Sequence, residues 1–99
     1  MPRNQYCYTF KPDVPLQDVE ITMLLALVAV ESLHGEIQVR LDSDYRIDAD
    51  RHACIVCVAT PVGRDLNRVF AGFARREYGE DAFRVERLGA EQLDTACAC

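Results

Sequence analysis

Residues 60–68 form the part of the sequence best suited to binding an anion. A threonine followed by proline at 60–61 is typical of the start of a helix. The N-terminus of a helix presents free backbone N–H groups that can bind an anion. Arg64 follows Gly63 directly, and Arg68 lies one helical turn after Arg64. This arrangement favours a phosphate or a carboxylate, although a capped helix with solvated arginines has the same sequence pattern. The candidate ligand-binding residues are Thr60, Gly63, Arg64, Arg68 and, from another segment, Arg40.

Acid–base chemistry involving imidazole would depend on Glu31, His34 and His52, which are the candidate catalytic residues. Glu31 and His34 are three residues apart, so they would share one face of a helix. His34 would also lie near a helix C-terminus, where the dipole favours a cation. That position gives His34 a structural explanation that requires no reaction. His52 would begin a strand beside an outward Arg40, which is the second place where an anion could be held.

Cys54 and Cys57 have the C-x-x-C spacing of redox and zinc motifs. We expect them in the middle of a strand, where residues three apart point to opposite faces, so the two sulfur atoms should diverge. They are therefore predicted to be core cysteines. Cys97 and Cys99 are the remaining candidates for binding a soft metal, although an incidental, unstructured tail explains them better. No cofactor is expected.

The periodicity of apolar residues predicts four strands and two helices. Residues 6–10, 36–41 and 83–88 alternate as half-buried strands, and residues 45–47 could resume the second of these. The side chains expected to point inward from the second and fourth strands are those of Ile37, Val39, Leu41, Phe83 and Val85. Residues 53–60 are apolar on both faces, as in a central strand. Apolar residues at helical spacing predict helices over 16–34 and from 61 to the residue before Gly79.

The order β-α-β-β-α-β predicts an α+β, ferredoxin-like sandwich. Its antiparallel sheet would have four strands in the order 4-1-3-2, with two helices on one face. Residues 1–88 should form a single domain, and residues 89–99 a flexible C-terminal tail.

Composition excludes several classes of function. The net charge is −5, which disfavours binding to nucleic acid. No apolar stretch reaches the roughly 20 residues needed to span a bilayer, and residues 1–5 do not begin a secretory signal. We therefore expect a cytoplasmic protein with no membrane partner. Ten of the eleven basic residues are arginines, which suggests a bacterial source with a GC-rich genome.

The strongest functional prediction concerns association. Residues 21–30 are apolar around most of the helix, and the strand over 53–60 is apolar on both faces. Large apolar patches are rare on monomers, so we expect a homodimer or a partner protein to cover these surfaces. The sequence thus favours a small non-enzymatic binding or regulatory module that self-associates through the sheet or the first helix. The alternative is a small enzyme that acts on an anionic substrate at a subunit cleft with the histidines and arginines named above.

Overall fold

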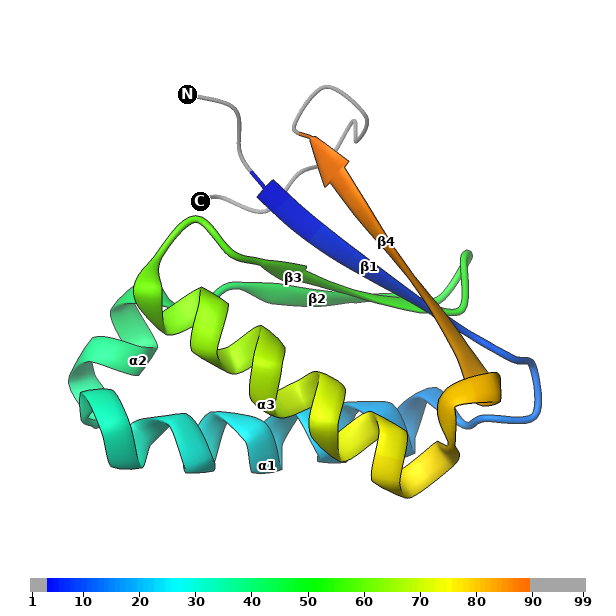
Figure 1. The fold of residues 1–99 in the computed structure, drawn as a ribbon, viewed down its shortest axis with the longest axis horizontal. Helices are drawn as coiled ribbons and strands as arrows, with labels where there is room; N and C mark the ends of the chain where they lie inside the picture. The colour runs from blue at the N-terminus through cyan, green and yellow to red at the C-terminus, as the bar shows by residue number, and fades with distance from the viewer. Residues whose placement is uncertain (1–3, 90–99) are drawn as a thin grey trace.

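The computed structural model describes residues 4–89, which form three helices, one short 3-10 turn and four strands (Figure 1). Their bounds are β1 Asn4–Phe10, α1 Leu16–His34, α2 Glu36–Asp42, β2 Tyr45–Asp48, β3 Ala53–Cys57, α3 Pro61–Tyr78, η1 Glu80–Ala82 and β4 Phe83–Gly89. The sequence-based bounds of the first helix are confirmed. Residues 90–99, which hold almost all of the predicted tail, lie outside the described part of the chain.

The four strands form one antiparallel sheet in the order β2-β3-β1-β4. Tyr8 in the centre of β1 lies opposite Cys54 of β3 and Val85 of β4. The helices lie on one side of this sheet (Figure 1). The predicted α+β class with an antiparallel four-stranded sheet is therefore confirmed.

The prediction of a strand over residues 36–41 is wrong, because this segment forms α2. Gly35 adopts a φ of 85°, in the left-handed region that favours glycine, and there α1 ends and α2 begins. Only Val39 is buried in α2, whereas Ile37 and Leu41, which were expected to point inward, are 75% and 73% exposed. The outer edge of β3 is instead paired with residues 45–48 of β2.

The main core lies between the sheet and the helices. Tyr8 and Phe10 of β1 face this core, and the ring of Tyr8 meets Phe70 of α3 edge to face, with centroids 4.9 Å apart. Phe83 of β4 closes the same cluster against Tyr8 and Phe10. On the same edge strand, Val85 was expected to point inward, but it is 43% exposed.

The two cysteines of the C-x-x-C pair lie on opposite faces of β3, as predicted. Cys54 belongs to the main core, whereas Cys57 belongs to a second cluster with Cys7, Ala53 and Ile55. Every residue of β3 is buried. The central strand therefore contributes no exposed apolar surface.

Candidate functional site

The start of α3 is fixed by hydrogen bonds within the protein. The Thr60 hydroxyl oxygen accepts a hydrogen bond from the Gly63 backbone N–H at 2.9 Å, which caps the helix as the sequence predicts. The same hydroxyl donates to the Asp42 carbonyl oxygen at 2.9 Å, which ties α3 to the end of α2. Thr60 therefore acts as a structural cap in this arrangement.

Gly63 lies against β3. It is buried, and a Cβ atom added there would stand 2.3 Å from the Cys57 carbonyl oxygen. Glycine is needed at this position because α3 passes so close to the backbone of the strand. Neither Thr60 nor Gly63 lines the cavity that the neighbouring arginines form.

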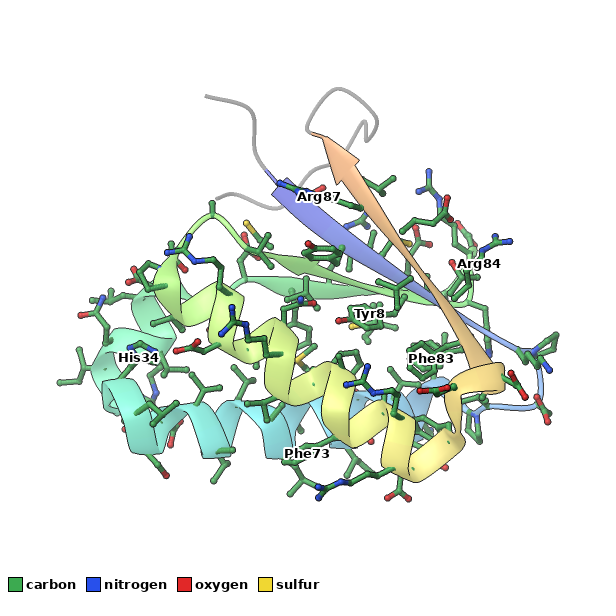
Figure 2. All side chains as sticks on the ribbon, in the orientation of Figure 1. Tyr8, His34, Phe73, Phe83, Arg84 and Arg87 are labelled. Atoms are coloured by element: carbon green, nitrogen blue, oxygen red, sulfur yellow. The ribbon has the colours of Figure 1, made fainter. Side chains whose placement is uncertain are left out.

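Arg64 and Arg68 line a cavity of about 220 Å³ together with Arg87 of β4. Arg87 lies directly opposite Tyr6 in the pairing of β4 with β1, and it is found beside the start of β1 (Figure 2). The cavity is lined by Tyr6, Val58, Arg64, Asn67, Arg68 and Arg87. It brings together two predicted candidates, Arg64 and Arg68, with side chains from both ends of the chain.

Asn67 connects this cavity to the core. Its side-chain carbonyl oxygen accepts a hydrogen bond from the Tyr8 hydroxyl. Burial raises the pKa of the Tyr8 phenol well above its usual value, so the hydroxyl stays protonated and remains a donor at neutral pH. This hydrogen bond orients the Asn67 side chain, whose amide nitrogen is a donor that can serve a ligand.

Arg40, the other predicted anion-binding residue, is not part of this cavity. It lies on α2 and pairs with Glu36 at 3.2 Å, where both side chains are largely exposed. The sequence pattern predicts Arg40 on a strand beside His52. Because that segment is helical, the expected relation between the two residues does not arise.

The two histidines make hydrogen bonds within the protein and are not brought together with each other. His34 Nε2 lies 2.7 Å from Asp65 Oδ2, at the place where α1 ends and α3 begins (Figure 2). His34 therefore pairs with Asp65 of α3 and not with Glu31, the partner expected from the sequence. His52 has a φ of 53°, and its Nε2 lies 2.7 Å from the Val14 carbonyl oxygen, which holds the β2–β3 turn against the β1–α1 loop.

We expect the His34–Asp65 contact to join α1 to α3. Replacing either residue with alanine should lower the free energy of unfolding by about 1 kcal/mol, since the two side chains are 23% and 35% exposed and water weakens the pair. A double-mutant cycle in urea should give a coupling energy of about 0.5–1 kcal/mol. Strictly additive losses would show that the two side chains do not interact in solution.

Metal-binding groups do not gather in the described part of the chain. Within residues 4–89, no group of three or more histidine, cysteine, aspartate or glutamate side chains is placed to hold an ion. Asp48 at the end of β2 accepts hydrogen bonds from the backbone N–H groups of Asp50 and Arg51, and so it closes the turn between β2 and β3. Cys97 and Cys99 lie outside the described residues.

The exposed apolar surface is concentrated on α1 and α2. Four side chains at helical spacing form what we call the α1 stripe: Ile21, Leu24, Leu25 and Val28, which are 55%, 49%, 58% and 61% exposed. Leu33 near the end of α1 and the α2 pair, Ile37 and Leu41, are 69–75% exposed. Two shallow cavities of about 260 and 190 Å³, between α1 and α3, both reach Leu25.

Arg87, Tyr6 and Asn67 were not among the site residues predicted from the sequence. A signal for Arg87 was present, because residues 83, 85 and 87 alternate on one face of a strand and the first two were assigned to the core side. Arg87 should have been placed on that face as well. Its proximity to Tyr6 follows only from the register of β4 against β1.

A comparison of the chain with protein-family models, with curated proteins and with solved structures gives no match. None of the helices within residues 4–89 is long and apolar enough to cross a bilayer.

Proposed function

We propose that this protein is a small, non-enzymatic binding module that forms a homodimer through α1. The α1 stripe is the observation that supports this function. Together with Leu33 and the α2 pair it offers on the order of several hundred Å² of apolar surface, against about 800 Å² per partner in a standard interface. A patch of this size has a favourable free energy of burial and no role in the core of its own chain.

A second copy of the chain suits the α1 stripe better than a partner of different chemistry. Residues 21–30 contain no charged side chain, whereas Asp18 and Glu20 precede them and Glu31 follows. Two α1 helices packed antiparallel about a two-fold axis near Leu24 and Leu25 would therefore meet through apolar residues alone. Spacings of three and four residues along the stripe are those by which paired helices interlock.

The fold is consistent with this assignment. The four-stranded antiparallel sheet with α1 and α3 on one side supports a ferredoxin-like arrangement, in which α2 replaces the first half of the predicted second strand. In that architecture the outer surface of the helix layer is free to pair. The enzyme alternative has less support, because neither histidine lines the cavity of Arg64, Arg68 and Arg87 or the two cavities between α1 and α3.

Light scattering in the presence of reductant tests this proposal. The wild-type protein should have twice the chain mass of 11.2 kDa, and Leu25→Glu should have the mass of one chain. A buried, unpaired carboxylate at the centre of the interface should raise the dissociation constant at least about 100-fold. Far-ultraviolet circular dichroism should show that the variant keeps its fold, since Leu25 is exposed in the single chain.

Val85→Glu is the matched control, because it introduces the same charge at an exposed apolar residue on β4, away from α1. It should remain dimeric. A wild-type protein that stays monomeric at several hundred micromolar would contradict the proposal. A dimer lost in Val85→Glu but kept in Leu25→Glu would assign the interface to the sheet edge instead.

A further inference from the structure

We propose that the cavity between α3 and the β1–β4 pair binds a small organic phosphate, a role that does not depend on the proposed self-association. We call this cavity the arginine pocket. Its polar walls are Arg64 and Arg68 from α3, Arg87 from β4, Asn67 and Tyr6. Side chains from three elements thus converge on one space of about 220 Å³.

In the part of the chain that the structure describes, the arginine pocket has no acidic residue to balance its positive charge. Within residues 4–89, no ion pair links Arg64, Arg68 or Arg87 to a carboxylate. No aspartate or glutamate among residues 4–89 lines the cavity. The neighbouring acids are engaged elsewhere, since Asp65 is held by His34 and Glu86 pairs with Arg84.

The remaining polar groups of the pocket also favour an anionic ligand. Asn67 presents its amide nitrogen because the Tyr8 hydroxyl donates to its oxygen, and the Tyr6 hydroxyl can donate as well. A guanidinium group donates and never accepts. The pocket therefore suits a ligand that carries several acceptor oxygens and negative charge, and it offers little to a cation or a neutral donor.

Charge and size narrow the ligand class. Each guanidinium fork can bind two oxygens, so three forks suit the three terminal oxygens and double charge of a phosphate monoester better than one carboxylate. The volume is below the roughly 300–1,000 Å³ of sites for drug-sized ligands, which favours a molecule of about ten non-hydrogen atoms. Tyr6 and Val58 provide an apolar wall for its carbon part.

The net charge of −5 does not oppose this assignment. At physiological ionic strength, charges more than about 8 Å apart are largely screened, so the three arginines determine the field within the pocket. Three guanidinium groups that line one cavity, with no carboxylate partner among residues 4–89, also repel one another. A dianion that relieves this repulsion should stabilise the fold as it binds.

Isothermal titration calorimetry with glycerol 3-phosphate at constant ionic strength tests the assignment. We expect a submillimolar dissociation constant and a rise in melting temperature with ligand concentration, whereas glycerol and chloride should have no effect. Arg87→Gln and Arg68→Gln should each weaken binding about 10- to 100-fold. Arg87→Lys keeps the positive charge but loses the planar guanidinium group that can bind two oxygens at once. Its affinity for glycerol 3-phosphate should lie between those of the wild type and Arg87→Gln.

Arg76→Gln is the matched control, because Arg76 is an exposed arginine of the same helix that lines a different cavity. It should bind glycerol 3-phosphate like the wild type. Absence of binding at 10 mM ligand, on the order of ten times the upper expected constant, or an equal loss in Arg76→Gln, would overturn the proposal. A short phosphoserine peptide that binds more tightly than glycerol 3-phosphate would overturn the assignment to a small molecule.

The pocket and the dimer can be separated by experiment. Leu25→Glu, which should be monomeric, should bind glycerol 3-phosphate with the affinity of the wild type, since Leu25 does not line the pocket. Loss of binding in that variant would contradict the independent site proposed here. A wild-type protein that is monomeric and still binds glycerol 3-phosphate would overturn the dimer and support the arginine pocket.

Discussion

Gly63→Ala is expected to lower the free energy of unfolding by about 3 kcal/mol, because the added methyl group has no space. Its Cβ atom would stand 2.3 Å from the Cys57 carbonyl oxygen and 3.2 Å from the Thr60 side-chain oxygen. The first of these is a backbone atom of the central strand and cannot rotate away. Relief requires the start of α3 to move off β3, which strains the cap at Thr60.

Gly72→Ala in the same helix is the control for this prediction. A Cβ atom there would have no neighbour within 4 Å. Alanine should therefore stabilise the helix by about 0.5–1 kcal/mol, since it loses less backbone entropy on folding than glycine. Urea denaturation of both variants, at one protein concentration to keep any self-association constant, should give shifts of opposite sign. A Gly63→Ala variant as stable as the wild type would show that α3 does not approach β3 so closely.

Gly63→Ala should also weaken the arginine pocket. Arg64 follows directly, and Arg68 is one turn further along α3, so a shift of the helix start would move both guanidinium groups relative to Arg87. In the proposed site this shift should reduce the affinity for glycerol 3-phosphate even under conditions where the variant is folded. Gly72→Ala should leave that affinity unchanged.

Elements with strong boundary residues could be predicted from the sequence. Pro15 and Gly35 bracket α1, and the interval between them has helical spacing of apolar residues, so its bounds were predicted correctly. The same holds for α3, which begins after Thr60 and ends before Gly79. Proline, glycine and a capping hydroxyl act locally, so no tertiary information was needed.

The segment 36–42 could not be assigned in this way. Its alternation of polar and apolar residues favours a strand, yet the structure forms a helix supported by the Glu36–Arg40 pair and by a hydrogen bond from Gln38 to Asp42. Six alternating residues fit either element when only one of them, Val39, is buried. The choice depends on which segment occupies the edge of β3, and β2 pairs there.

In the candidate sites, too, the spacing of residues within one element could be predicted, whereas contacts between elements could not. The spacing of Arg64 and Arg68 on one helix was evident from the sequence, but Arg87 approaches them only because β4 pairs with β1. His34 was assigned to Glu31, its neighbour in sequence, whereas the structure gives it Asp65 from α3. Contacts between distant segments depend on register and packing, which a single sequence does not display.

Phe70→Ala is expected to have the largest effect on stability, a loss of about 3–5 kcal/mol. Phe70 is fully buried, and its ring meets Tyr8 at 4.9 Å with an interplanar angle of 83°. Removing the ring deletes this edge-to-face contact and leaves a cavity between α3 and β1 that rigid neighbours cannot fill. For a domain of about 100 residues, the loss corresponds to a fall in melting temperature of more than roughly 15 °C.

Phe73→Ala provides the comparison, because Phe73 lies on the same helix (Figure 2). Its side chain is only partly buried. Phe73→Ala should lower the free energy of unfolding by about 1–2 kcal/mol, since this side chain buries less apolar surface than Phe70. A Phe70→Ala variant that loses no more than Phe73→Ala would contradict the packing of α3 on Tyr8. If the packing is as described, Phe70→Ala should also release the Tyr8 side chain that orients Asn67, and glycerol 3-phosphate affinity should fall together with stability.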